Sequence, residues 1–162
     1  VLSLIDKYYE GKIPNPENIN DNDNEILNEV ISQKNDIESN LNQFKFREAL
    51  KSLINIARIG NKFLADTEPW KIKNENPKRV EQILKTSFEI VSYLAVLSEP
   101  FIPHTSKKLK KMIGLNKSDW SNLDNLGREI NFNFTITNKE MLFRRIEDSE
   151  IEFQISRLKK DI

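Results

Sequence analysis

The sequence predicts an all-α fold, an antiparallel helix bundle that carries a C-terminal arm of mixed structure. Apolar residues recur every three to four positions over most of residues 1–115, which is the spacing of one helix face. The chain has only 4 glycines, too few for a turn-dense sandwich or barrel. The apolar stripes of about residues 24–43 and 46–65 are separated by so short a gap that their helices should form an antiparallel hairpin.

The first half of the chain predicts three helices. The chain opens with an apolar stripe at helical spacing, formed by Val1, Leu4, Ile5 and Tyr8. No capping residue precedes this stripe, and the first residue is not an initiator methionine. We therefore expect the chain to begin inside a helix and to be a piece of a larger protein. Gly11 suits the left-handed position at the end of that helix. The polar segment 12–23 has two prolines and predicts a loop that ends in a helix cap. Helices then follow from about Asn24 to Gln43 and from about Phe46 to Ala65.

Two further helices are expected after an irregular segment, 66–76, which Pro69 interrupts. Pro77 occupies a first-turn position at the start of a helix that extends to about Ser98. Residues 90–97 are apolar on nearly all sides, so this helix should be the central and most buried one. Pro103–Ile113 predicts a shorter, basic helix that Gly114 ends.

The C-terminal arm has a different pattern. Asn131–Thr137 alternates polar and apolar residues, as a short strand does, and Met141–Arg144 is expected to be extended too. Ile146–Leu158 predicts a last amphipathic helix. Trp120, beside Leu123 in a loop, is interpreted as an anchor that packs the arm on the bundle.

Little in the sequence points to catalysis within this chain. His104 is the only histidine, and its place at a helix start is typical of a surface or capping residue. Without cysteine there are no disulfides and no thiolate zinc sites, so no metal site is expected. No glycine-rich phosphate loop occurs. No apolar run is long enough to cross a bilayer, and 25 basic residues balance 25 acidic ones, so any contact with nucleic acid must be a local patch.

Trp70 is the strongest candidate for binding. It follows Pro69 in a polar segment, where no helical stripe includes it. One interpretation is an indole packed over the end of the bundle, and the other is a platform on which an unpaired base stacks. Basic residues flank it on both sides: Arg58, Lys62, Lys71, Lys73, Lys78 and Arg79. Arg58 and Lys62 are four residues apart and share a helix face.

A second basic group lies on the predicted fifth helix: Lys107, Lys108, Lys110 and Lys111. Lysines near a helix C-terminus complement the helix dipole, and this interpretation is preferred over phosphate binding.

Several segments resemble the anticodon-binding domain of methionyl-tRNA synthetases. FREALKSLINIARIGNKFLADTEPWK, residues 46–71, has the family's F-x-x-A-L, N-K-[FY] and proline–tryptophan pattern. KYYEGKIP, residues 7–14, is similar to the family's helix exit, and residues 97–115 are similar to its closing helix pair. Residues 142–155 match the tail pattern LF-x-x-IED-x-x-I-x-x-QI, known in the family as a linker that folds back toward the catalytic domain.

This resemblance implies a role in reading the CAU anticodon of tRNA(Met). Trp70 matches the family's indole that stacks on the first anticodon base, and Asn61 matches a further family position. The family's other anticodon-contacting residues, an asparagine and an arginine four positions apart, would fall just before Val1. Arg58, Lys62 and Lys71 are the remaining possible tRNA contacts.

The resemblance also implies how the chain is organised and where it works. Residues 1–115 would form the anticodon-binding bundle and 116–162 the linker arm. The full-length parent would be a cytoplasmic methionine–tRNA ligase, and this piece alone should be inactive. No cofactor is expected in this chain, because ATP and methionine would bind the catalytic domain. The expected partners are tRNA(Met) and that catalytic domain.

Two alternatives stay open. The chain could be the equivalent domain of another class I synthetase, with a different anticodon. It could also be a helical protein-interaction module without RNA binding, which predicts a buried Trp70.

Overall fold

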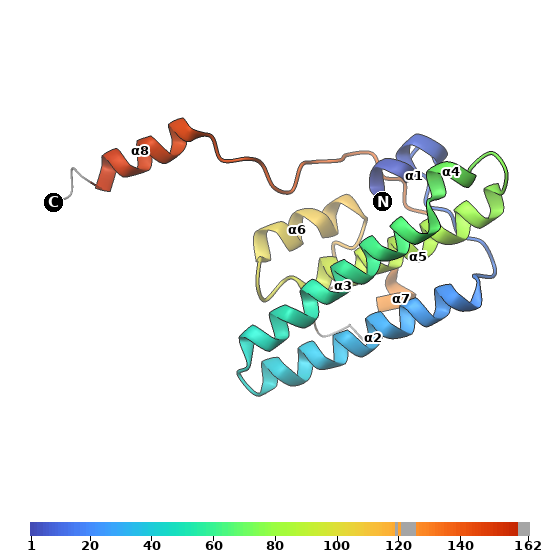
Figure 1. The fold of residues 1–162 in the computed structure, drawn as a ribbon, viewed down its shortest axis with the longest axis horizontal. Helices are drawn as coiled ribbons and strands as arrows, with labels where there is room; N and C mark the ends of the chain where they lie inside the picture. Colours follow the sequence, from blue (N-terminus) through green and yellow to red (C-terminus); the bar gives the residue numbers. More distant parts are fainter. Residues whose placement is uncertain (119, 121–125, 159–162) are drawn as a thin grey trace.

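The computed structural model describes residues 1–118, 120 and 126–158, and within these ranges it is helical and contains no strand (Figure 1). The predicted all-α bundle is confirmed. Its helices are α1 (Leu2–Tyr9), α2 (Asp21–Asn42), α3 (Phe46–Thr67), α4 (Pro69–Ile72), α5 (Pro77–Leu97), α6 (Pro103–Met112), α7 (Leu126–Glu129) and α8 (Asp148–Leu158).

The α2–α3 hairpin forms one side of the bundle, and both helices pack on α5. The short connection, residues 43–45, makes them antiparallel as the sequence predicts. Helix α2 begins three residues earlier than expected because Asn20, not a later residue, caps it: its side chain accepts a 2.8 Å hydrogen bond from the backbone N–H of Asn22.

Helix α5 is the central helix, as its apolar surface predicts. Its buried residues face α2, α3, α6 and α7, all of which contact it. The ring of Phe88 is fully buried there and is among the largest enclosed side chains. The core therefore lies along α5, and α1, α2, α3, α4, α6 and α7 are arranged around it.

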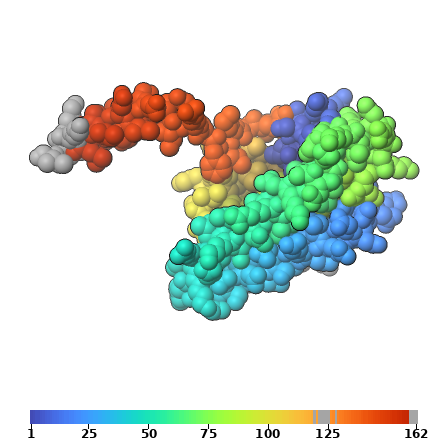
Figure 2. All heavy atoms as spheres, in the orientation of Figure 1, coloured from blue at the N-terminus to red at the C-terminus, as the bar shows by residue number. Residues whose placement is uncertain are grey.

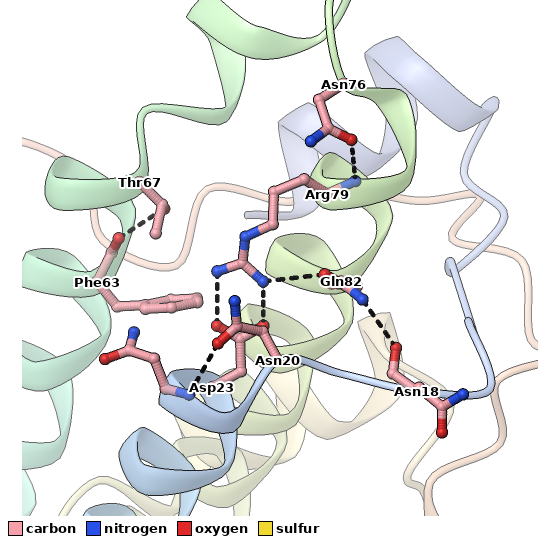
Figure 3. A network of polar contacts seen from close by, with 9 residues as sticks. Asn18, Asn20, Asp23, Phe63, Thr67, Asn76, Arg79 and Gln82 are labelled. Atoms are coloured by element: carbon pink, nitrogen blue, oxygen red, sulfur yellow. Dashed lines mark hydrogen bonds and ion pairs between the residues drawn. The ribbon is translucent and has the colours of Figure 1, made fainter.

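A buried ion pair joins the start of α2 to the start of α5 (Figure 3). Asp23 is 0% exposed, and its two carboxylate oxygens accept hydrogen bonds of 2.6 and 2.7 Å from the guanidinium of Arg79. The same guanidinium donates to Gln82 Oε1 at 3.1 Å, and Gln82 in turn donates to the carbonyl of Asn18. Asn76 caps α5 by accepting from the backbone N–H of Arg79. This network fixes the loop before α2 against the first turn of α5.

The strand predicted for Asn131–Thr137 is wrong. A strand needs a partner with which it can form a ladder of hydrogen bonds, and the residues that the structure describes offer this segment no neighbouring strand. One antiparallel bridge forms, between Lys12 and Thr135, with a 2.9 Å bond from the N–H of Ile136 to the carbonyl of Gly11. Met141–Arg144, which was expected to be extended, lies outside any helix and has bends at Leu142 and Phe143.

Gly11 permits this contact. Its φ of 79° lies in the left-handed region, as expected at the helix exit. A Cβ on Gly11 would also stand 2.3 Å from the carbonyl oxygen of Ile136. Glu10, with a φ of 54°, caps α1, and Gly11 continues this left-handed turn and lets the arm pass closely over it.

The first part of the arm packs on the bundle. Leu126, Ile130 and Ile136 are buried in the same core cluster as α5. The ring of Phe132 lies 6.3 Å from that of Phe88. Trp120 packs against this core, which confirms its role as an anchor; its predicted neighbour, residue 123, lies outside the described residues.

Helix α8 projects away from the bundle at the end of an extended segment (Figures 1 and 2). None of its residues is buried. Its first turn is fastened locally: Arg144 donates to Glu150 through both guanidinium nitrogens, one bond being 2.6 Å, and Glu150 also accepts from the backbone N–H of Glu147.

Acid should loosen this turn. The hydrogen bond from Arg144, followed by that from Glu147, lowers the pKa of Glu150 from 4.5 to about 2. A carboxyl group whose pKa is lowered by folding stabilises the folded form above its unfolded pKa, and this contribution is lost as the pH falls through the folded pKa. We therefore expect α8 to lose helicity between pH 4.5 and 2, measured by the chemical shifts of its amides in NMR spectra. Glu150→Gln should abolish that transition, and a loss of α8 signals only in step with those of α5 would contradict the prediction.

Candidate nucleic-acid interface

Trp70 is held on the surface by a one-turn helix. Helix α3 ends at Thr67, and Glu68, with a left-handed φ of 40°, turns the chain into α4. Within α4, Pro69 is buried and Ile72 packs against the core, and residues three apart share a helix face. Trp70 lies on a different side of this turn and is 48% exposed. About half of the residue is therefore accessible to solvent, and an unpaired base could reach the indole there.

The cations near Trp70 have different roles. Lys71 forms a 2.8 Å ion pair with Glu68, one that is largely exposed. Lys73 lies over the ring of Tyr8, and Lys78 is exposed at the start of α5. Arg79, which the sequence placed with them, is engaged in the ion pair with Asp23 instead. Fewer cations therefore surround the indole than the sequence indicated.

Arg58 and Lys62 come together, as their four-residue spacing predicts, in a groove of about 370 Å³ between α2 and α3. The apolar side chains Ile26, Ile59 and Phe63 also line it. Asn22, Asn55 and Thr67 add polar groups, and Glu29 and Asp66 add two carboxylates. The groove thus has donors suited to phosphate beside acidic groups that moderate its positive potential.

Asn61 lies on another side of α3. It lines a smaller groove, about 90 Å³, between α3 and α5, where Val1 forms one end. Asn61 is exposed, as are Arg58 and Lys62. The structure therefore separates the candidate residues of α3 into two grooves.

The second basic group is divided in a similar way. Lys110 is 8% exposed and donates to Glu99 at 3.0 Å and to the carbonyl of Ser118 at 3.1 Å, so it holds α6 in place. Lys108 and Lys111 line a groove of about 320 Å³ beside Phe134. His104 is exposed at the start of α6, as expected.

The sequence did not single out Tyr8 beyond its place in the apolar stripe. The structure brings it into contact with Lys73, which follows α4, at 3.8 Å from the amine to the ring centroid. Spacing alone could not reveal this pair, because it depends on how α1 packs beside α4.

The residues that the structure describes contain neither a cluster suited to a metal ion nor a helix suited to spanning a membrane. Their His, Asp and Glu side chains form no group of three or more that could hold a metal ion. None of their helices is both long enough and apolar enough to cross a membrane.

The fold and the site together define a class of protein, the all-helical bundles that carry an exposed tryptophan on a short turn between two helices. Comparison with known proteins gives the family. The family described as the anticodon binding domain of methionyl tRNA ligase matches residues 13–160. The chain belongs to this family, as the resemblance in its motifs predicts.

Individual relatives agree. The chain is 43% identical over 159 residues to the methionine–tRNA ligase of Bacteroides fragilis strain YCH46, an alignment that covers 97% of this chain and 23% of that protein. It is 42% identical to the methionine–tRNA ligase of Phocaeicola vulgatus, with the same coverage. The chain thus spans about a quarter of the length of these relatives.

The fold is also similar to solved structures. The apo form of Mycobacterium tuberculosis methionyl-tRNA synthetase superposes with a TM-score of 0.81 at 20% identity, over 90% of this chain and 30% of that one. The same enzyme in complex with methionyl-adenylate gives 0.78 at 19% identity, over 89% of this chain and 29% of that one. At this identity the likeness establishes the fold.

Proposed function

We propose that the chain reads the CAU anticodon of tRNA(Met), with Trp70 stacking on the first anticodon base. The observation that carries the proposal is the exposed indole of Trp70 on a turn in which Pro69 is buried and Ile72 packs against the core. A base stacked on such a ring gains about 1–3 kcal/mol. Arg58, Lys62 and Lys71 would contact the phosphates, and Asn61, from the neighbouring groove, would contact RNA or support the hairpin.

The proposal extends to the parent protein. It would be a cytoplasmic methionine–tRNA ligase in which ATP and methionine bind a catalytic domain outside this chain, and this chain alone would be inactive. Helix α8 fits a contact with that domain, because it exposes the apolar side chains Ile151, Ile155 and Leu158 and none of its residues is buried.

The alternatives have less support. An interaction module without RNA binding predicts a buried Trp70, and about half of this side chain is exposed. The domain of another class I synthetase would read a different anticodon, and the relatives named above are methionine–tRNA ligases.

Fluorescence titration tests the proposal. Because Trp120 is the second tryptophan, the Trp120→Phe variant makes Trp70 the sole indole. A CAU anticodon stem-loop should quench its fluorescence, less so as salt rises. In a competition assay with labelled stem-loop, Trp70→Ala should weaken binding roughly 5- to 150-fold, since stacking contributes about 1–3 kcal/mol per base.

Phe46→Ala is the matched control, because Phe46 is another exposed aromatic residue but lies at the opposite end of α3. It should leave the affinity unchanged, whereas a changed anticodon should reduce it. If neither this chain nor a version lengthened by the residues that precede Val1 in its parent bound the stem-loop, the anticodon assignment would be wrong.

A further inference from the structure

We infer that Tyr8 is a positioning residue for Trp70: its ring holds Lys73, and through it the α4 turn, against α1. The inference rests on the proposed function of Trp70 and adds to it the contact that fixes the direction of the indole. Tyr8 would not touch RNA itself.

The contact is a close cation–π pair. The Nζ atom of Lys73 lies 3.8 Å from the centroid of the Tyr8 ring, whereas that of Lys7, the preceding residue, lies 5.8 Å away. Such pairs are attractive within about 6 Å and stronger where water is partly excluded. Both Tyr8 and Lys73 are half-buried, and Tyr8 packs against the hydrophobic core. The ring is therefore a fixed support rather than a mobile one.

Helix α4 needs such a support. It has four residues, and a single turn is not stable alone, because the cost of nucleating a helix is recovered only over several turns. Pro69 and Ile72 attach its inner side to the core, and α4 contacts α5. Lys73 directly follows α4 and lies three positions after Trp70. Its contact with the Tyr8 ring connects this turn to α1. The Tyr8 contact thus adds an attachment on the side of α1 to those that α4 makes with the core and with α5.

The experiment uses the Trp120→Phe background, in which Trp70 is the only fluorophore of its kind. Tyr8→Leu and Lys73→Met remove the ring and the charge, and Tyr8→Phe and Lys73→Arg retain them. Lys7→Met is the matched control, because its amine is farther from the same ring. The measurements are the time-resolved fluorescence anisotropy of Trp70, the affinity for the CAU stem-loop, and the Tm.

We expect Tyr8→Leu and Lys73→Met to give the indole a faster local motion and to weaken stem-loop binding roughly 2- to 30-fold, the range of a cation–π contact. The two conservative variants and Lys7→Met should behave like the parent. In a Trp70→Ala background, Tyr8→Leu should weaken binding no further, because its effect passes through the indole. A purely structural role would lower the Tm while leaving the anisotropy decay unchanged.

The outcomes separate the two proposals. An unchanged anisotropy decay in Tyr8→Leu, or an equal loss of affinity with and without Trp70, would overturn the positioning role. If the anisotropy responds as expected but the parent fails to bind the stem-loop even when lengthened, the proposed function fails, and with it the link from Tyr8 to RNA.

Discussion

Replacing Arg79 with methionine is expected to lower the free energy of unfolding by about 3–5 kcal/mol, because it leaves a buried carboxylate without its partner. Asp23 has no exposed surface, and both of its oxygens are satisfied by the Arg79 guanidinium. Methionine is of similar length, so the loss would come from the charge and its hydrogen bonds rather than from a cavity. Urea denaturation followed by circular dichroism measures the effect.

Two variants make this test specific. Lys78→Met, next to it and exposed, should change stability by less than about 0.5 kcal/mol, as surface substitutions do. The double variant Asp23→Leu with Arg79→Met removes both charges and should recover much of the loss. A cost for Arg79→Met as small as that for Lys78→Met would show that the pair does not hold α2 to α5.

Phe88→Ala is expected to cost about 3–5 kcal/mol, the range for truncating a large aromatic residue in a packed core. Phe88 is fully buried on α5, and its ring contacts that of Phe132 in the arm. The variant should therefore also expose the backbone of residues 130–136, which hydrogen exchange measures. Phe46→Ala, an exposed phenylalanine, is the control and should cost little. Loss of stability without faster exchange in this segment would mean that the arm is held by other contacts.

The bundle could be predicted because its helices carry their own signals. The apolar period defined α3 and α5 to within two residues at each end, and Pro77 marked the start of α5. The pairing of Asp23 with Arg79 could not be predicted, since 56 residues separate them and only the packing of α5 beside α2 brings them together. In residues 131–137 polar and apolar side chains alternate, and the apolar Ile136 is indeed buried. Such alternation cannot reveal whether a partner strand exists.

The candidate site was predictable in part. Trp70 was singled out because no helical stripe includes it, and the structure leaves it exposed. The sequence could not predict that Arg58 and Lys62 line one groove and Asn61 lines another. Neighbouring residues on a helix point about 100° apart, but the sequence does not tell where α2 and α5 lie around α3, so it cannot assign each direction to a groove.

The length of helix α3 sets the position and direction of Trp70, because α3 joins the tip of the α2–α3 hairpin to the turn that carries this residue. Each residue added to a helix advances its end by about 1.5 Å and rotates it by about 100°. One inserted residue in the middle of α3 would thus turn Trp70 away from its present side of the bundle, while seven would restore the direction and move the indole about 10 Å farther out. Evolution can therefore vary the length of this helix only in steps close to whole turns if Trp70 is to keep facing the same ligand.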